Sequence, residues 1–316
     1  MTKILSVEAI APATSANLGA GFDVFSVALD ALFDSVHVEV VEGNSIQISV
    51  EGIGADLVPV EPGKNTAGIV AKILLDLSKK ECGLTMKIKK GIKPGSGLGS
   101  SAASAAAAAL AINEALNLNL SRRELIKFAA QGETASAGAP HADNVSSALL
   151  GFFTVVKSYD PLEVIQLPSP KNVEFVIAVP DMVIETRLAR SVLPKRVKLS
   201  DLVYNVGHAA TFIAGITLND VDLMGKSMTD SIIEPARAHL IPGLAEVKKS
   251  AIEAGAAGVT ITGAGPSILA LVNAEKKKAD DVAEAMRNAF EKQGINCQTV
   301  CAKPGPGARI VRRKQL

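Results

Sequence analysis

The stretch that decides the fold reads Lys93-Pro94-Gly95-Ser96-Gly97-Leu98-Gly99-Ser100-Ser101-Ala102-Ala103. Three glycines within five residues let the backbone adopt positive φ angles and approach a ligand closely. Two serines follow, and then an alanine-rich segment that predicts a helix over residues 100–116. Because a helix N-terminus offers unpaired N–H groups and a positive dipole end, it favours a bound phosphate. We therefore predict a phosphate-binding loop, rather than a plain loop before a serine-capped helix.

Two better-known nucleotide motifs do not describe this loop. Gly225-Lys226-Ser227 has the end of a Walker motif, but Asp220 stands where the first glycine is required. The dinucleotide fingerprint G-x-G-x-x-G also fails, because Ser100 follows Gly99. The loop therefore belongs to another class of phosphate site.

The segments around the loop predict a chain of mixed strands and helices. With 316 residues, 48% of them hydrophobic, the chain has enough material for about two domains. Residues 158–172 contain three prolines and scattered charge, which indicates a boundary. We predict domains at 1–160 and 161–316, each an α/β or α+β sandwich.

Local patterns predict individual elements. Alternating valines and isoleucines predict a β-hairpin over residues 35–51. Asn65 is placed to cap one helix, and Ser121 with Glu124 forms a capping box for another that ends near Gly138. In the second half we expect strands at 173–179, 259–262, 268–272 and 296–302, and helices at 200–217, 219–229, 243–254 and 276–292.

Composition excludes several classes of function. A net charge of +1 argues against a dedicated nucleic-acid binder, and 3% aromatic residues with no Trp leave little for a membrane-interface belt. Three cysteines are too few for a disulfide framework, so we expect a reducing cytoplasm. Residues 254–274 carry no charge, but Gly-Ala-Gly-Pro at 263–266 makes a buried strand–loop–strand a better interpretation than a membrane span.

Polar clusters elsewhere provide candidate ligands. Asn17 and Asp23 flank a glycine-rich turn, where Asp23 would bind an ammonium group or form an Asx turn. Glu133 and Asp143 supply carboxylate oxygens that suit Mg²⁺, whereas His141 has no second histidine at zinc-ligand spacing. Glu133 lies late in a predicted helix, where the dipole disfavours a carboxylate, so a nearby cation is expected.

Two arginines complete the candidates. Thr186-x-x-x-Arg190 and Glu234-Pro235-x-Arg237 each present a guanidinium, which suits bidentate capture of a carboxylate or phosphate. A single surface arginine is otherwise solvated or in a weak ion pair.

Taken in order, these elements resemble the motifs of the GHMP kinases. Three segments match over nearly the whole chain: residues 12–23, 95–103 and 262–267. The pattern at 12–23, with His141-x-Asp143-Asn144 and the two arginine motifs, is similar more narrowly to the homoserine kinases. The resemblance implies an α+β fold, with a ribosomal-protein-S5-domain-2-like N-terminal domain and a ferredoxin-like C-terminal α/β sandwich. It also implies a dimeric enzyme that phosphorylates the hydroxyl of L-homoserine. The composition adds the expectation of a cytoplasmic protein that uses neither membrane nor nucleic acid.

The resemblance also assigns roles residue by residue. Asp23 would bind the substrate ammonium, and Arg190 and Arg237 its carboxylate. Asn17, His141 and Asn144 would orient the substrate, and Asp143 and Thr186 are the candidate catalytic residues. Ser101 and Glu133 would hold Mg²⁺. ATP would contact Asn65 and the loop residues Lys93, Pro94, Gly95, Ser96, Gly97, Leu98, Gly99, Ser100, Ser101, Ala102 and Ala103.

Lys93 is one departure, because many family members have Pro at that position. We expect an altered start of the loop but no loss of binding. No lysine partner is evident for Asp143, so direct transfer, with the hydroxyl proton passing to phosphate or water, stays open.

Two alternative functions remain at this point. One is another GHMP kinase, acting on mevalonate or shikimate, although two arginines with Asp23 suit a zwitterionic amino acid better. The other is a catalytically silent metabolite sensor, against which the complete set of Ser101, Glu133 and loop glycines argues.

Overall fold

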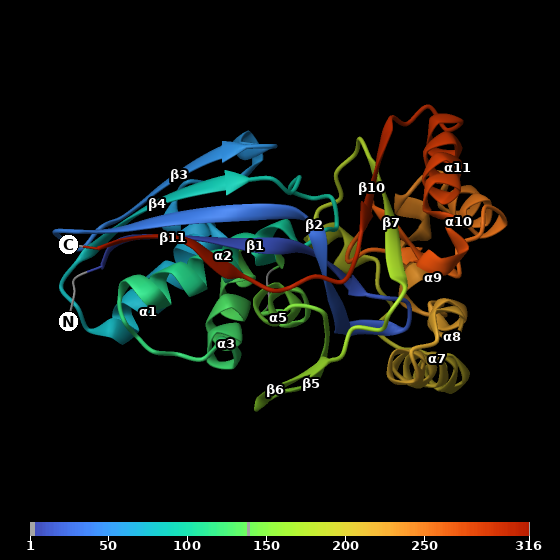
Figure 1. The fold of residues 1–316 in the computed structure, drawn as a ribbon, viewed down its shortest axis with the longest axis horizontal. Coiled ribbons are helices and arrows are strands. Elements are labelled where there is room, and N and C mark those ends of the chain that lie inside the picture. Colours follow the sequence, from blue (N-terminus) through green and yellow to red (C-terminus); the bar gives the residue numbers. More distant parts are fainter. Residues whose placement is uncertain (1–3, 138–139, 316) are drawn as a thin grey trace.

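Two β-sheets, each covered by helices, make up the computed structural model, which describes residues 4–137 and 140–315 (Figure 1). The first sheet has the order β11-β1-β2-β4-β3, with β5 paired to β2 and to β6. Its strands are antiparallel neighbours except β3 and β4, which are parallel. Their bounds are β1 Ile4–Asn17, β2 Gly21–Val41, β3 Ile46–Gly52, β4 Gly83–Lys90, β5 Phe153–Tyr159, β6 Leu162–Leu167 and β11 Arg309–Gln315.

The hairpin predicted over residues 35–51 is wrong. Both strands form, as the end of β2 and as β3, but β4 lies between them and hydrogen-bonds to each. Leu84, Met86 and Ile88 of β4 are fully buried, which suits a central strand better than the half-exposed β3. Alternation thus identifies a strand and its inner face but not its neighbour.

Helices pack on one face of this sheet (Figure 1). The α2 helix lies at the centre and is almost wholly buried, because alanines let it approach β1, β2, α1 and α3 closely. Asn65 caps α1 and Ser121 with Glu124 forms the capping box of α3, as predicted. The bounds are α1 Thr66–Ser78, α2 Ser100–Ala115, α3 Arg122–Gly132, α4 Thr134–Ala137 and α5 Asp143–Leu150, with short 3-10 turns at Ala55–Leu57 and Pro62–Lys64.

The helix predicted from Ser121 to about Gly138 is interrupted. It ends as α3 at Gly132, and α4 begins two residues later. The position expected for its end, Gly138, lies outside the described residues. Glu133 therefore sits at a helix C-cap rather than inside a helix.

The second sheet has the antiparallel order β10-β7-β9-β8. In chain order this is 4-1-3-2, with helices after the first and third strands, which is the ferredoxin-like arrangement that the resemblance implies. Its strands are β7 Val173–Pro180, β8 Gly258–Ile261, β9 Ile268–Asn273 and β10 Cys297–Ala302. Residues 254–274 thus form a buried strand–loop–strand. Among the described residues no helix is long and apolar enough to cross a membrane.

Both faces of this sheet are buried. Phe175 and Ile177 of β7 pack in the larger hydrophobic core, which also contains side chains of the first sheet, α7 and α8. Val176 and Ala178 pack in a second core, which contains side chains of α10 and α11. Two apolar faces explain the continuous hydrophobic run of this strand. The helix bounds are α6 Thr186–Ser191, α7 Leu199–Leu218, α8 Val221–Ser227, α9 Ile233–Arg237, α10 Leu244–Glu253 and α11 Ala279–Glu291, with 3-10 turns at Ala238–Leu240 and Ala274–Lys276.

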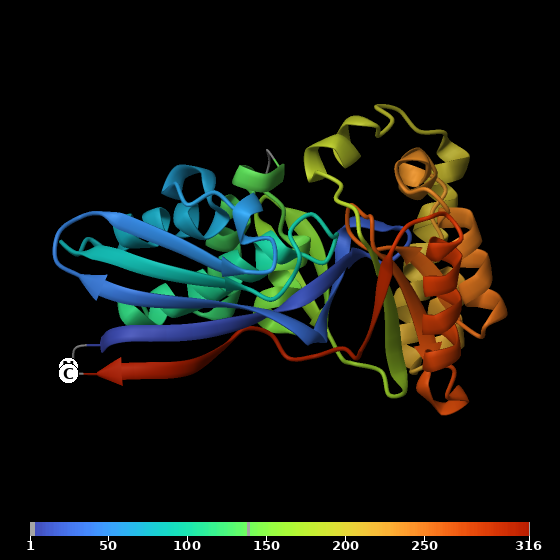
Figure 2. The ribbon, with the colours of Figure 1, turned by 90° about the horizontal axis from the view of Figure 1, so that it is seen from above.

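The two halves share structure. Phe25 and Phe153 of the first sheet meet Phe175 and Phe212, with ring centroids 5.8–6.3 Å apart. The chain then returns, and β11 pairs with β1 along the edge of the first sheet (Figure 2). The predicted boundary between residues 160 and 161 falls in the turn of the β5–β6 hairpin. Two strands beyond that boundary, β6 and β11, hydrogen-bond within the first sheet.

Candidate active site

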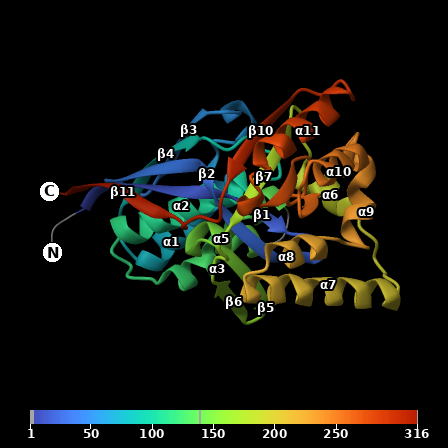
Figure 3. The same ribbon diagram turned by 45° about the vertical axis from the view of Figure 1, so that its right-hand side comes forward.

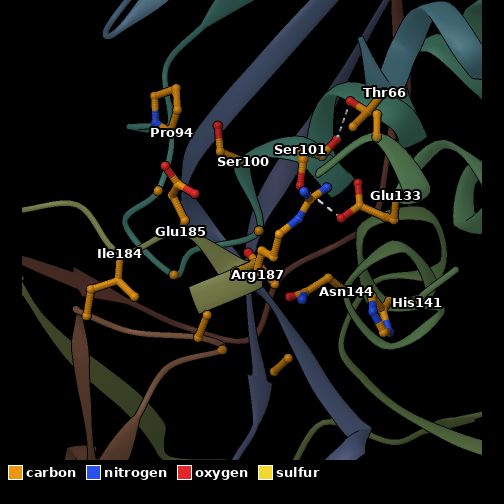
Figure 4. Close-up of a pocket in the computed structure, with 18 of the residues that line it drawn as sticks. Thr66, Pro94, Ser100, Ser101, Glu133, His141, Asn144, Ile184, Glu185 and Arg187 are labelled. Atoms are coloured by element: carbon orange, nitrogen blue, oxygen red, sulfur yellow. Dashed lines mark hydrogen bonds between the residues drawn. The ribbon is translucent and has the colours of Figure 1, made fainter. Parts of the chain in front are cut away.

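A pocket of about 620 Å³ lies between the two halves. Its walls come from the loop before α2, the start of α5, helix α6, the end of α9 and the β8–β9 turn (Figure 4). Segments from three motifs far apart in sequence therefore meet around one cavity. Its position between domains is common for sites that bind small molecules.

The glycine-rich loop has the conformation that its sequence requires. Gly95, Gly97 and Gly99 have φ angles of 70°, 83° and 63°, in the left-handed region that favours glycine. A Cβ on Gly97 would lie 2.5 Å from the Thr262 carbonyl oxygen. The Thr262 hydroxyl also donates to the Gly97 carbonyl at 2.8 Å. The loop is thus locked against the β8–β9 turn.

The N-terminus of α2 opens toward this pocket. Its N-cap is Gly99, so no side-chain hydrogen bond caps the first turn. The Ser96 and Ser100 hydroxyls instead donate to the Lys93 and Ile92 carbonyls, at 2.7 and 2.8 Å. The first-turn N–H groups of α2 therefore keep their capacity for an anion.

Other members of the predicted loop have structural positions. Leu98, Ala102 and Ala103 are buried in the core. The ammonium of Lys93 lies 2.7 Å from Asp181 and lowers the pKa of that carboxyl through their hydrogen bond. Lys93 is therefore turned toward β7 and the second half.

Ser101 and Glu133 meet beside the loop. The Ser101 hydroxyl donates to Glu133 Oε2 at 2.9 Å, and Glu133 is buried. Within the described residues no group of three or more His, Cys, Asp or Glu side chains could enclose a metal. A hydroxyl beside one carboxylate fits Mg²⁺, which takes one or two protein oxygens and completes its shell with phosphates and water.

Asn65 lies at the pocket wall, but its amide already has partners. Its side chain donates to the Pro59 carbonyl at 2.6 Å and accepts from Gly68 N at 3.2 Å. It holds the 53–65 segment against α1 and shapes that end of the pocket.

Asp23 and Arg190 form the other end. The guanidinium donates to both carboxylate oxygens, at 2.6 and 3.1 Å, and lies 3.2 Å from His141 Nδ1. Burial, and then the charge of Arg190, lower the pKa of His141. Arg190 and Arg237 also face the ring of Phe22, each 5.3 Å from its centroid.

Arg237 and Asn17 are fixed by backbone carbonyls. Arg237 is buried and donates to the carbonyls of Ala189 and Gly263, at 3.0 and 2.9 Å. Asn17 also donates to the Gly263 carbonyl, at 2.8 Å, and accepts from Asp23 N. The N-terminal turn, α6 and the β8–β9 turn are thus tied together at one point.

The predicted residues of α5 and α6 also line the pocket. Asn144 accepts from the Thr14 hydroxyl at 2.7 Å, and Thr186 begins α6. Asp143 is buried, and its Oδ1 has no hydrogen-bond partner within the described chain. Burial, and then the charge of Asp23, raise the pKa of Asp143 to about 6.

One buried network behind the loop is not among the predicted residues. Lys90 contacts Asp34 in a buried ion pair and donates to the Ser100 carbonyl and the Ser104 hydroxyl, at 2.8 and 2.7 Å. Asp34 also accepts from two backbone N–H groups of the loop's first residues. A signal exists in the sequence, because Asp34 and Lys90 continue the inward-facing alternation of Val36 and Ile88.

Comparison with known proteins agrees with this geometry. The family models described as the GHMP kinases N terminal domain and GHMP kinases C terminal match residues 65–152 and 212–292. Homoserine kinase of Methanococcus maripaludis is 44% identical, covering 96% of this chain and 98% of its own. That of Methanocella arvoryzae is 43% identical, covering 98% and 99%.

Solved structures give the same result. The homoserine kinase of Cytophaga hutchinsonii superposes with a TM-score of 0.92 at 38% identity, over 98% of this chain and 99% of its own. The mevalonate kinase of L. major, 16% identical with a TM-score of 0.68 over 96% of both chains, shares the fold. The chain belongs to the GHMP kinases and, among them, to the homoserine kinase family.

Proposed function

We propose that this protein transfers the terminal phosphoryl group of ATP to the side-chain hydroxyl of L-homoserine. The observation that carries the proposal is the two-ended pocket. One end has a glycine-rich loop and a helix N-terminus suited to phosphates, and the other has Asp23 paired with Arg190. The full-length similarity to proteins named homoserine kinase supports it.

The loop residues Lys93–Ala103 hold the ATP phosphates in this proposal, with Asn65 shaping the wall nearest the nucleoside. Ser101 and Glu133 would hold Mg²⁺, which would neutralise phosphate charge when bound. Gly95, Gly97 and Gly99 adopt the positive φ angles that let the loop backbone curve around the phosphates. The pre-formed loop therefore needs little rearrangement to bind the nucleotide.

The substrate's two charges match the ion pair of Asp23 and Arg190. A homoserine ammonium replaces Arg190 as the partner of Asp23, and the substrate carboxylate binds Arg190 and Arg237. Each protein charge exchanges one partner for another, so binding leaves neither one buried alone. Asn17, His141 and Asn144 orient the bound molecule. A hydroxy acid without an ammonium would leave Asp23 unmatched.

The chemistry consists mainly of positioning. The homoserine hydroxyl oxygen attacks the terminal phosphorus, the bond to the bridging oxygen of ADP breaks, and the hydroxyl proton leaves. Asp143, buried beside the substrate end with its pKa near 6, accepts that proton, and Thr186 holds the reacting hydroxyl. Phosphoryl transfer asks little of a base, so this contribution is modest beside positioning and charge neutralisation.

ADP release coupled to an NADH-consuming assay tests the proposal. L-homoserine, mevalonate, shikimate and L-serine are compared at equal concentration with Mg-ATP. We expect turnover that is selective for homoserine. Selectivity for mevalonate or shikimate would contradict the substrate, and ATP binding without turnover on any acceptor would favour a sensor.

We also propose a cytoplasmic homodimer. Helix α7 lies along one edge of the molecule (Figure 3). It exposes Leu199, Leu202, Val203 and Val206, whose exposed fractions lie between 46% and 75%. A contiguous apolar strip of this kind is typical of an interface. Sedimentation of the wild type and of Val203→Glu tests it, with a dimer for the first and a monomer for the second expected. A wild-type monomer would contradict the proposal.

A further inference from the structure

One cationic side chain that lines the pocket pairs with no carboxylate among the described residues. Five cationic side chains among the described residues line the pocket: Lys64, Lys90, Arg187, Arg190 and Arg237. The first pairs with Glu61 at the surface and the second with Asp34. Arg190 pairs with Asp23, and Arg237 is bound to two carbonyls. Arg187 has no ion pair with any residue in the described part of the chain.

Arg187 is directed at the nucleotide end of the pocket. Figure 4 shows its guanidinium extending toward Ser101 and Glu133 at the wall of the pocket. Glu133 sits at a helix C-cap, where the dipole disfavours a carboxylate. The Arg187 guanidinium therefore lies beside Ser101 and Glu133, where the proposed function places Mg²⁺ and the terminal phosphate of ATP.

The short helix α6 thus carries two arginines with different targets. Arg187 and Arg190 are three residues apart, on neighbouring positions of one helix. One points to the phosphate end, and the other binds Asp23 at the substrate end. Thr186 precedes both. The helix thus presents one arginine to each end of the pocket, and the segment before it contacts the loop through the Ile184 N–H, which donates to the Gly95 carbonyl at 3.2 Å.

We propose that Arg187 binds the terminal phosphate of ATP and stabilises its charge as the phosphoryl group moves to the acceptor. This rests on the proposed function for the identity of the acceptor but not for the phosphate contact. Arginine suits the task because its planar fork donates two hydrogen bonds to phosphate oxygens and stays charged. The residue would also distinguish ATP from ADP, which lacks that phosphate.

Nucleotide binding without any acceptor tests the phosphate contact directly. Titration calorimetry with Mg-ATP and Mg-ADP compares the wild type with Arg187→Met, Arg187→Lys and the control Arg196→Met. Arg196 is exposed, lies beyond the same helix and does not line the pocket. We expect Arg187→Met to weaken ATP about 10- to 100-fold, the range of hydrogen bonds to a charged group. ADP affinity should stay within about twofold of the wild type, with partial recovery in Arg187→Lys.

The kinetic arm uses the same variants with homoserine. The turnover number of Arg187→Met should fall at least as much as ATP affinity, while the KM for homoserine changes little. Equal losses of ATP and ADP affinity would overturn the proposal. Unchanged ATP affinity with an altered Mg²⁺ requirement would also overturn it, since that result would indicate that Arg187 acts only on the metal ligand Glu133 and not on the phosphate.

The two proposals fail separately. If homoserine is not phosphorylated but Arg187→Met still loses its preference for ATP, the proposed function falls and the arginine contact stands. If homoserine is phosphorylated and Arg187→Met matches Arg196→Met in all measurements, the arginine contact falls and the proposed function stands.

Discussion

At the scale of single residues, the two arginines of the substrate end differ in what else they hold. Arg190 is partly exposed and bonded to Asp23, whereas Arg237 is buried and supports two backbone carbonyls. Removing Arg237 takes this donor from the Ala189 carbonyl, at a cost of about 1–3 kcal/mol, whereas the Gly263 carbonyl keeps its hydrogen bond from Asn17. Removing Arg190 leaves Asp23 without this ion pair, but the Asp23 side chain is partly exposed to solvent. We therefore expect substitution of Arg237 to lower the stability of the fold and substitution of Arg190 to leave it unchanged.

We predict that Arg190→Met and Arg237→Met both raise the KM for homoserine about 10- to 100-fold, since each removes charged hydrogen bonds to the carboxylate. The KM for ATP should change little. Thermal unfolding should show a lower Tm for Arg237→Met only. An unchanged homoserine KM in both variants would contradict the substrate orientation.

Asp143 should make both activity and stability depend on pH. Its folded-state pKa is raised to about 6 by burial and by Asp23, above the ordinary 3.8. The protonated form is therefore favoured in the folded state. Its stabilising contribution is complete below pH 4 and is lost as pH rises through 6, and the difference corresponds to ~3 kcal/mol.

We predict that Asp143→Asn makes unfolding stability less sensitive to pH between 4 and 7, because the group that titrates is gone. In the wild type, kcat should rise with pH around 6 as the carboxylate forms. Urea unfolding and initial rates across this range measure both. A wild-type profile that is unchanged in Asp143→Asn would contradict the assigned proton acceptor.

Sequence reasoning predicted which residues line the site better than what they contact. Asp23, Arg190 and Arg237 were all expected, but Asp23 and Arg190 were assigned to opposite ends of a ligand, and the structure pairs them with each other. A sequence motif specifies which residue types are present at a site. Which of these residues pair with each other depends on the position of α6 in the fold. Lys90 and Asp34 were missed although their phase in two strands marks them as inward-facing.

At the scale of elements, the phosphate loop and the β8–β9 turn act as one unit. Gly97 meets the carbonyls of Thr262 and Gly265 with no space for a side chain, and the Ser267 N–H donates to the Ser96 carbonyl at 3.2 Å. A motif of the first half is therefore shaped by a motif of the second. The buried pair of Lys90 and Asp34 supports the loop from behind.

We predict that Gly97→Ala lowers stability and raises the KM for ATP at least tenfold. The matched control is Gly294→Ala, whose φ of 74° imposes a similar conformational cost of about 1–2 kcal/mol with open space around the new Cβ. The control should lose stability and keep its ATP kinetics. Equal kinetics in the two variants would show that the loop tolerates displacement.

Elements themselves were largely predictable, because capping residues and hydrophobic periodicity are local. The caps of α1 and α3, the alanine helix α2 and the four strands of the second sheet formed as expected. The exceptions are the helix from Ser121, which ends early at Gly132, and the hairpin over residues 35–51. Strand pairing is set by which strand best fills the buried centre of the sheet, and β4 lies more than 30 residues further along the chain.

At the scale of the whole molecule, the aromatic cluster and β11 make the two halves interdependent. Phe212 of α7 contacts Phe25 and Phe153 of the first sheet. The last strand returns to β1 from the second half. Neither feature was predictable, because each joins segments that are distant in sequence and have no local signature.

We predict that Phe212→Ala, which empties a buried site at a cost of about 3–5 kcal/mol, increases hydrogen exchange in β5 as well as in α7. Phe290→Ala, buried in the core of α10 and α11, is the matched control. It should increase exchange in α11 and β10 and leave β5 protected. Exchange confined to α7 in the first variant would indicate that the halves unfold independently.

The chemical identity of the product tests the central claim most directly. L-homoserine labelled with ¹⁸O at the side-chain hydroxyl is incubated with the protein and Mg-ATP, and the product is examined by ³¹P NMR. We predict one phosphate monoester whose signal shows the ¹⁸O isotope shift, because the hydroxyl oxygen attacks phosphorus and is retained. An acyl phosphate, an ester without the label, or inorganic phosphate released alone would contradict transfer to the homoserine hydroxyl.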